Sequence, residues 1–277
     1  MIPLIVIRGG GDLASGVALR LFRTGFQVVI LELERPLAVR RKVSFSEAVY
    51  EGTTIVEGAT SRLVSPDQLM VSVEAGEIPV LIDPNANILR NQFLTSPHST
   101  FLIDARLLKT APELLDVNLP LHIGLGPGFT AGEDCHAVVE TRRGHTLGRV
   151  YWDGASLPDN GKPDGDPRRV LRATEDGVVT NHAEIGDHVE DGQLIVELQS
   201  ENKDRKTEIT SPFKGVVRGI IRPGIEVTEG TKIGDVDPRD DSSACFLVSD
   251  KSLAVAGGVL EAVLMKLKQL EIESPDL

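Results

Sequence analysis

The length, composition and charge of the chain exclude several classes of protein. Its 277 residues allow about two domains with a sizeable core. The 41 acidic and 29 basic side chains give a formal net charge of -12, which repels nucleic-acid backbones and anionic membranes. The amino terminus lacks a signal-peptide pattern, and no run approaches the roughly 20 apolar residues of a membrane span. We expect a cytoplasmic protein with two reduced cysteines and no nucleic-acid or membrane partner.

The first thirty-odd residues predict a nucleotide-binding βαβ unit. An apolar run at 4–7 predicts a doubly buried strand, and the glycine cluster after it fits G-x-G-x-x-A. A helical pattern follows, closed by Gly25, and 26–33 predicts a second strand. Glycines at such a turn let a diphosphate approach the backbone amides at the helix amino terminus. The predicted phosphate-binding residues are Gly9, Gly10, Gly11, Asp12, Leu13 and Ala14, and the alternative is a purely structural turn.

An acidic side chain stands at the end of the second predicted strand. Glu32 follows the glycines by about twenty residues, the spacing at which a carboxylate contacts a ribose hydroxyl. Arg40 and Arg41 lie close enough in sequence to accommodate a 2′-phosphate. Both NAD and NADP therefore remain as expected ligands.

The next hundred residues continue the alternation of strands and helices. Segments 53–56, 79–83 and 100–104 predict strands, and 65–75 and 87–93 are compatible with helices, which together predict a doubly wound Rossmann-like α/β domain. Asp83, Asp104 and Arg106 would then lie at the carboxyl edge of the sheet, where ligands of such folds bind. The alternative is helix capping by the aspartates and a solvated arginine.

Residues 122–136 contain four glycines and a proline, which is incompatible with an ordinary helix or strand. As a functional loop, this segment would offer a second backbone cradle for an anion, with Cys135 or His136 as the reactive group. The alternative is a crossover loop with a buried structural cysteine. The cradle would consist of Gly126, Gly128 and Thr130.

Segments 137–141 and 146–151 predict a hairpin with charged side chains at its tip. Arg143 would grip a phosphate or carboxylate, and His145 would shuttle protons, unless the tip is only a solvated turn. Cys135, His136 and His145 do not have a zinc-ligand spacing, so we expect no metal site.

A polar, turn-rich segment from 152 to 167 predicts a domain boundary. Beyond it, the sequence repeats itself once, with Gly177 and Val179 matched by Gly215 and Val217, which predicts two interlocked β units in a small barrel. This part resembles the barrel-sandwich domains of biotinyl and lipoyl proteins, in which a hairpin lysine carries the cofactor. Lys203 is nearest to that position but lacks the flanking residues of either family, so a docking or lid role is expected. The predicted domains are 1–152, 168–240 and 241–277, the last containing an amphipathic helix at 249–270 that packs on a domain or on a second subunit.

Four motifs resemble a known family over nearly the whole chain. They are Ile7-Arg8-Gly9-Gly10-Gly11-Asp12-Leu13-Ala14-Ser15-Gly16, Arg40-Arg41-Lys42-Val43-Ser44-Phe45, Glu140-Thr141-Arg142-Arg143-Gly144-His145 and Lys232-Ile233-Gly234-Asp235-Val236-Asp237-Pro238-Arg239. The chain resembles the YqeB-like accessory proteins of selenium-dependent molybdenum hydroxylase systems, and its glycine segment is similar to XdhC-like factors.

The resemblance implies a role in maturing a molybdenum enzyme, with that client enzyme or other maturation factors as partners and a molybdenum pterin nucleotide as an additional candidate ligand. Two alternatives stay open. One is an NAD(P)-dependent oxidoreductase with His136 or His145 as proton donor. The other is a scaffold that binds a client enzyme without any ligand.

Overall fold

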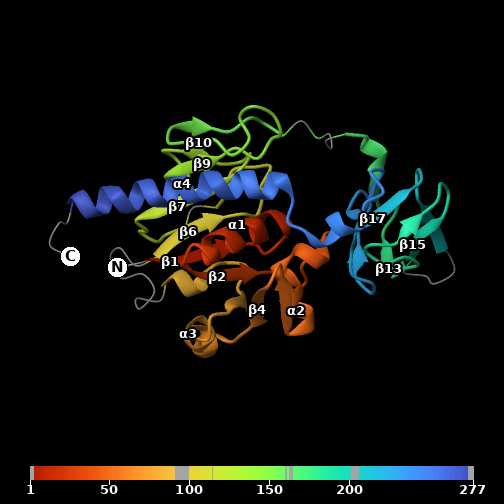
Figure 1. Cartoon of the computed structure of the whole chain (residues 1–277), viewed down its shortest axis with the longest axis horizontal. Helices are drawn as coiled ribbons and strands as arrows, with labels where there is room; N and C mark the ends of the chain where they lie inside the picture. The colour runs from red at the N-terminus through yellow and green to blue at the C-terminus, as the bar shows by residue number, and fades with distance from the viewer. Residues whose placement is uncertain are drawn as a thin grey trace. The chain divides into compact units, whose positions relative to one another are not determined.

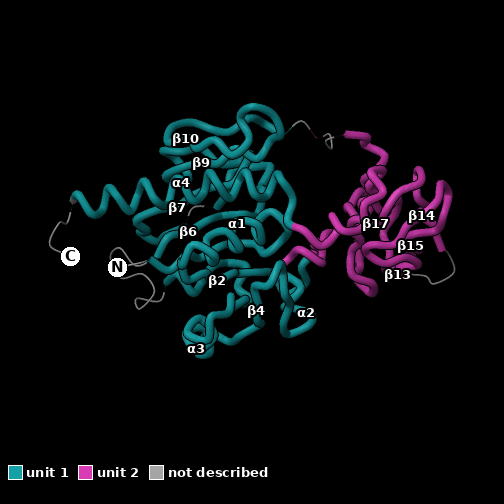
Figure 2. The backbone as a smooth tube through the Cα atoms, viewed as in Figure 1, with its two compact units in different colours: residues 1–36, 45–160, 248–277 teal, residues 37–44, 161–247 magenta. Residues whose placement is uncertain are grey.

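The structure is a computed structural model that describes residues 3–90, 100–113, 115–159, 161, 165–200 and 206–273 (Figure 1). The chain forms two compact units, of which unit 1 contains 1–36, 45–160 and 248–277, and unit 2 contains 37–44 and 161–247 (Figure 2). The predicted domain ranges run consecutively along the chain. The structure instead assigns the short segment 37–44 to unit 2 and returns the last helix to unit 1.

Unit 1 contains a mostly parallel sheet of nine strands among the described residues, in the order β10-β9-β7-β6-β1-β2-β5-β4-β3. Apolar β-branched runs are buried on both faces of its central strands, as a parallel sheet requires. The predicted doubly wound α/β pattern is confirmed. The strands are β1 (Leu4–Arg8), β2 (Gln27–Glu32), β3 (Thr53–Val56), β4 (Ala59–Leu63), β5 (Ile78–Ile82), β6 (Thr100–Asp104), β7 (Leu121–Leu125), β9 (Ala137–Val139) and β10 (Val150–Tyr151).

The edges of this sheet are antiparallel. The strand predicted at 53–56 is β3, which forms a hairpin with β4, and the hairpin predicted around 142–145 is formed by β9 and β10. The helical segments between strands are short: α2 (Ala48–Glu51), η3 (Pro66–Gln68), α3 (Leu69–Glu74) and η4 (Asn87–Arg90). Residues 91–93 of the segment predicted as helix-compatible lie outside the described residues.

The glycine-rich segment does contain a strand, so the prediction that 122–136 could hold no ordinary strand was wrong. Four of its residues belong to β7, which pairs with β6 and β9 in parallel. Gly124 is required there because the ring of Phe129 occupies the space that its side chain would fill. The remainder forms the loop that holds β8 (Thr130–Ala131), which pairs with β11 (Gly154–Ala155).

Two helices pack together in unit 1 (Figure 1). They are α1 (Asp12–Arg23), which follows the glycine turn and ends before Gly25, and α4 (Asp250–Glu273), which confirms the predicted carboxyl-terminal helix. The segment 243–272 is long and apolar enough to cross a membrane by length and composition alone. Part of its apolar surface packs inside unit 1, where Val255, Val259 and Val263 of α4 are fully buried, whereas Leu264 and Met265 are 52% and 49% exposed.

Unit 2 contains two four-stranded antiparallel sheets among its described residues, β12-β19-β17-β14 and β16-β15-β13-β18. The sequence repeat is present in the structure, because β13, β14 and β15 recur as β17, β18 and β19, and strands of both copies enter both sheets. The interlocked barrel-sandwich prediction is confirmed. The strands are β12 (Val170–Arg172), β13 (Gly177–Asn181), β14 (His188–Val189), β15 (Leu194–Gln199), β16 (Lys206–Thr210), β17 (Gly215–Ile220), β18 (Glu226–Val227) and β19 (Lys232–Asp237), with η5 (Pro167–Arg169) before them, η6 (Ser243–Phe246) after them and η1 (Arg41–Val43) in the segment 37–44. Lys203 lies outside the described residues.

Candidate functional site

The glycine turn lies where the central strand β1 ends and α1 begins. Gly9 has a φ of 91°, which favours glycine, and its N–H donates to the carbonyl of Leu31 at 2.7 Å. The first helical hydrogen bond runs from the Ser15 N–H to the Gly11 carbonyl. Among the described residues, the amides of Gly11, Leu13 and Ala14 donate to no protein acceptor. These amides are the unpaired donors of a helix amino terminus, where anions bind.

Glu32 binds back onto the same turn. Its carboxylate accepts from the Gly10 N–H at 2.6 Å and from the Leu33 N–H at 2.7 Å, and the residue is 7% exposed. Burial raises the pKa of Glu32, while the two backbone hydrogen bonds oppose this shift. The carboxylate that was predicted to bind a ribose therefore already accepts the hydrogen bond of the Gly10 N–H.

Arg40 and Arg41, the residues proposed for a 2′-phosphate, lie in unit 2. The Arg40 guanidinium donates to the carbonyls of Ala244 and Leu247 at 3.1 and 3.0 Å, and Arg41 Nε donates to the carbonyl of Ile220 at 2.8 Å. The structure does not bring them together with Glu32 in one unit.

A charge cluster lies at the carboxyl ends of β1 and β6. The Arg8 side chain is 2% exposed and bonds Asp104 at 3.3 Å, and Arg106 bonds the same carboxylate at 2.7 Å. Glu113 accepts from both arginines, at 2.7 and 2.9 Å, and these contacts lower its pKa to about 2 although burial acts in the opposite direction. Asp104 and Arg106 therefore form an ion network rather than a cap and a solvated arginine. Arg8 was not among the predicted site residues, although a charge that ends a doubly buried strand is unusual.

A pocket of 720 Å³ opens at the carboxyl ends of β4 and β5. Asp83 lines it, but its carboxylate accepts from the Ile88 N–H at 2.8 Å and from Asn87 Nδ2 at 3.1 Å, which supports the capping alternative. Ile82, the neighbour of Glu32 across the β2–β5 pair, also lines the pocket. No sequence pattern indicates this pocket, because its walls come from separate segments, 63–68 and 81–88.

The glycines of the middle loop are packed against the protein itself. A side chain at Gly126 would collide with Thr141, and one at Gly128 would lie 2.7 Å from the Thr110 carbonyl. The Gly126 N–H donates to Val139 at 2.9 Å, and the Thr130 N–H donates to Asp134 at 2.9 Å. These contacts support the structural alternative for this loop rather than a second anion cradle.

Cys135 and His136 line a second pocket, of 420 Å³, together with His122 of β7. The Cys135 thiol is buried 3.3 Å from the Ala137 carbonyl, and burial raises its pKa to about 11, which suppresses the reactive thiolate. The His136 Nδ1 accepts from the His122 N–H at 3.0 Å, and burial lowers the pKa of His136. Burial also lowers the pKa of His122 to about 4, so both imidazoles are neutral near pH 7. Strand alternation in β7 could have indicated His122.

The hairpin tip does not collect the predicted groups into one site. Arg143 forms a bidentate ion pair with Asp250 at the start of α4, at 2.6 and 2.7 Å. His145 is exposed, and its carbonyl accepts from Arg149 Nε at 3.3 Å. In the part of the chain that the structure describes, no three His, Cys, Asp or Glu side chains form a group able to hold a metal ion.

The comparison with protein families agrees with the architecture of unit 2. Residues 171–236 of unit 2 match the biotin/lipoyl family model, described as biotin-requiring enzyme. Among solved structures, the chain resembles the product-bound ectoine utilization protein EutE (DoeB) from Ruegeria pomeroyi with 11% identity and a TM-score of 0.25, over 84% of this chain and 56% of the other. An aspartoacylase family protein from Mesorhizobium loti gives 12% identity and a TM-score of 0.27, over 85% and 84% of the two chains. Scores this low do not establish a shared fold.

One curated relative covers nearly the whole chain. The uncharacterized protein YqeB of Escherichia coli (strain K12) is 42% identical over 271 residues, which is 96% of this chain and 48% of that protein. The chain is therefore similar to YqeB over almost its full length, as its motifs predicted, and it spans about half the length of this relative.

Proposed function

We propose that the chain is a nucleotide-binding accessory factor in the maturation of a molybdenum hydroxylase. One observation carries the nucleotide-binding part of this proposal: the amides of Gly11, Leu13 and Ala14 have no acceptor among the described residues at the exit of β1. A phosphate at that position would accept from these amides and would face the positive end of the α1 dipole. The family resemblance supplies the maturation part.

The pocket at β4 and β5 fits the base of the same nucleotide. Along the carboxyl edge of the sheet, β1 is followed by β2, β5 and β4. Neighbouring strands lie about 4.8 Å apart, so this pocket is roughly two to three strand spacings from the glycine turn. That separation suits a nucleotide whose phosphates lie at α1 and whose base enters the pocket beside Ser65 and Gln68. In this arrangement Glu32 orients the turn through the Gly10 amide and offers its remaining lone pairs to the ribose.

NAD, NADP and the cytidine-type nucleotide of a molybdenum pterin share the diphosphate that this site would bind. The client enzyme or other maturation factors are the proposed partners. Arg8 ends β1 and Arg106 follows the neighbouring strand β6, and both guanidinium groups pair with Asp104 and Glu113 beside the proposed phosphate position.

The proposal is tested by adding NAD, NADP and cytidine diphosphate separately to the purified chain and measuring the thermal unfolding midpoint, together with mass and absorbance spectra of the protein as purified. We expect at least one nucleotide to raise the midpoint. Gly11→Glu should abolish this increase, because a side chain at Gly11 has open space but would place a carboxylate beside the amides. Gln27→Glu adds the same charge at the opposite end of β2, where the residue is exposed, and should leave binding intact.

An unchanged midpoint with all three nucleotides would contradict the proposal and favour the scaffold alternative. The same holds if Gly11→Glu binds as tightly as the unaltered chain.

A further inference from the structure

The outer face of α4 lies outside the nucleotide site proposed above. Among the described residues, the buried side chains of α4 end at Val263, although the helix continues to Glu273. Its last turns run on past the strands of the sheet (Figure 1) and expose three large apolar side chains, those of Leu264, Met265 and Ile272. A short helical segment without packing contacts is marginally stable in water. This face is therefore a candidate for contact with another molecule.

The solvent-facing residues of α4 form one stripe along the helix, which we call the outer stripe. It lies on the face opposite Val255 and Val259, which are fully buried. Most of its members follow one another at spacings of three or four positions, as residues on one helix face do. The outer stripe consists of Gly257, Glu261, Leu264, Met265, Lys268 and Ile272.

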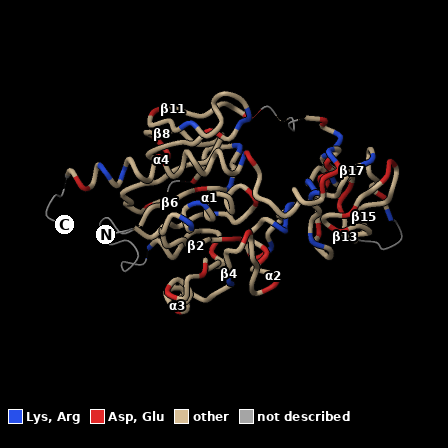
Figure 3. Tube along the Cα trace, viewed as in Figure 1, with Lys and Arg blue, Asp and Glu red and all other residues tan. Residues whose placement is uncertain are grey.

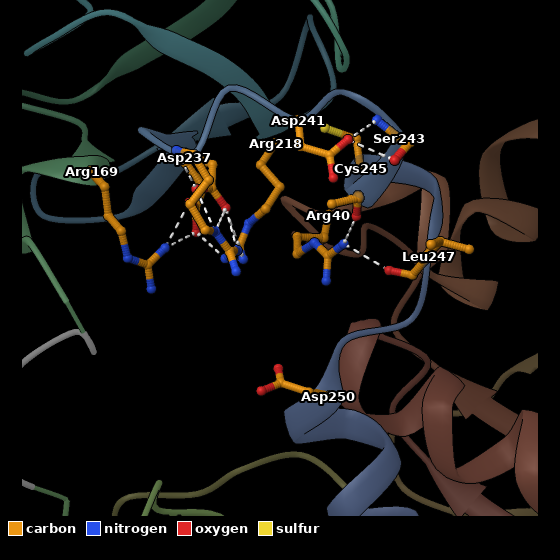
Figure 4. A network of polar contacts seen from close by, with 12 residues as sticks. Arg40, Arg169, Arg218, Asp237, Asp241, Ser243, Cys245, Leu247 and Asp250 are labelled. Carbon is orange, nitrogen blue, oxygen red and sulfur yellow. Dashed lines mark hydrogen bonds and ion pairs between the residues drawn. The ribbon is translucent and has the colours of Figure 1, made fainter.

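The two charged side chains of the outer stripe have no partner in the part of the chain that the structure describes. Figure 3 shows acidic and basic positions together on the last turns of α4. Neither the Glu261 carboxylate nor the Lys268 ammonium group bonds another described residue. In the first turn of the helix, by contrast, Asp250 (Figure 4) forms a bidentate ion pair with Arg143 at 2.6 and 2.7 Å. The outer stripe thus offers one acid and one base to a partner.

The outer stripe is complementary to itself in the antiparallel direction. A two-fold axis that passes between Leu264 and Met265 pairs these two side chains across the axis. The same axis places Glu261 of each copy opposite Lys268 of the other, because both pairs have the same midpoint in the sequence. Apolar contacts at the axis would then be flanked by an ion pair on each side.

The ends of the outer stripe fit the same axis. Ile272 is 71% exposed, the highest fraction for a large hydrophobic side chain among the described residues. The axis places Ile272 opposite Gly257 of the second copy. The nearest atom to a side chain added at Gly257 would be the end of the Arg20 side chain, 3.9 Å away, so space is open there. A large residue that faces a small one lets two surfaces interdigitate.

We propose that two copies of the chain associate through the outer stripe as an antiparallel, two-fold symmetric helix pair. Each copy buries Leu264, Met265 and Ile272 in the contact, and Glu261 of each copy pairs with Lys268 of the other. Such a contact uses the same patch on both copies, so assembly stops at the dimer. The two charges of the stripe cancel, so the contact avoids local repulsion in a chain with a formal net charge of -12. This inference does not depend on the nucleotide site.

Sedimentation equilibrium of the full chain at several protein concentrations measures the association. We expect the average mass to rise with concentration from that of one chain to that of two. Met265→Gln should weaken dimerisation at least about tenfold, because it places a polar side chain at the apolar centre of the contact. Met70→Gln is the matched control, since Met70 is a helical methionine of α3 with a similar exposure, 43% against 49%, and lies outside the stripe.

Charge reversal tests the register of the two helices. Glu261→Lys alone and Lys268→Glu alone each place like charges opposite one another twice in the dimer, so each variant should dimerise at least about tenfold more weakly. A mixture of the two variants restores both ion pairs in a heterodimer and should associate as tightly as the unaltered chain. Both positions are exposed, and circular dichroism should show that each variant keeps its helix content.

The inference is overturned if the chain stays monomeric at every concentration, if Met265→Gln dimerises as the unaltered chain does, or if the two charge variants do not associate when mixed. A monomer that cosediments with phosphatidylcholine vesicles would also overturn it and would assign the outer stripe to a membrane surface. Gly11→Glu separates the two proposals, because it should abolish nucleotide binding and leave dimerisation unchanged.

Discussion

Buried carboxylates in this protein are held by specific donors. Glu32 is held by two amides, Asp104 by two arginines and Asp235 by three cations. A buried charge is tolerated only with such partners, and removing one partner exposes the desolvation cost of the other. Substitution of these carboxylates should therefore lower the free energy of unfolding, because the buried cations or amides that bind them would lose their acceptors.

Asp237→Asn is expected to lower the stability of unit 2 in a pH-dependent manner. The pKa of Asp237 is about 2, below its usual value, so its stabilising contribution is complete above the pKa of the unfolded chain, about 4. That contribution is lost as the pH falls towards 2. Calorimetry at several pH values should show a difference between the variant and the unaltered chain that is constant near neutrality and disappears in acid. Asp191→Asn, at an exposed position, should show no such trend, and a difference that grows in acid would contradict the prediction.

Cys135 should react slowly with iodoacetamide in the folded protein. A pKa of about 11 instead of 9 reduces the thiolate fraction about a hundredfold near neutral pH, and burial restricts access further. Peptide mass spectrometry after timed labelling should therefore show alkylation at least about a hundredfold slower than in urea-unfolded protein. Fast labelling of the folded chain would restore Cys135 as a reactive group.

Small residues let the elements of unit 1 approach one another closely. A side chain at Gly16 of α1 would lie 2.6 Å from the Ser252 side chain of α4, and one at Gly148 would lie 2.5 Å from the Ala254 carbonyl. Glycine lowers helix stability, so Gly16 serves packing rather than helix formation. The contact between α1 and α4 thus depends on the absence of one methyl group.

Gly16→Ala should destabilise the protein by about 1–3 kcal/mol, because overpacking outweighs the gain in helix propensity. Gly257→Ala is the matched control: it lies in α4, and the nearest atom to its new side chain would be 3.9 Å away. This control should stabilise the protein by up to about 1 kcal/mol. Urea unfolding of both variants measures the two effects, and a neutral Gly16→Ala would show that the helices can separate without cost.

Unit 1 is interrupted along the chain by two segments, 37–44 and 161–247, which together form unit 2. The shorter segment is bonded to the longer one, because the Ile220 N–H donates to the Val39 carbonyl at 2.9 Å. Gly219 allows this approach, since a side chain there would lie 2.9 Å from the same carbonyl. Unit 2 is therefore completed by a segment more than a hundred residues away in sequence.

A fragment containing only 161–247 should unfold at a lower temperature than the same fragment with 37–44 joined to its amino terminus by a glycine-serine linker. Without that segment, the Ile220 N–H and the Ala244 and Leu247 carbonyls that accept from Arg40 lose their partners. Circular dichroism melting measures the difference. Equal melting temperatures would show that 37–44 contributes nothing to unit 2.

The sequence by itself determined the elements whose signals are local. The glycine turn, α1 and β2 followed from apolar periodicity and from glycines that permit unusual backbone angles. The repeat in unit 2 predicted its interlocked strands, because related segments adopt related structures. The unpaired amides at the start of α1 were expected for the same reason, since every helix begins with such donors.

Tertiary structure alone decided which side chains meet. It brought Glu32 onto the Gly10 amide, made β7 a strand against Phe129 and placed Arg40 in unit 2. It also gathered Arg169, Arg218 and Lys232 around Asp235. These contacts join segments distant in the chain, and their energies depend on burial and on neighbouring charges that no local pattern contains.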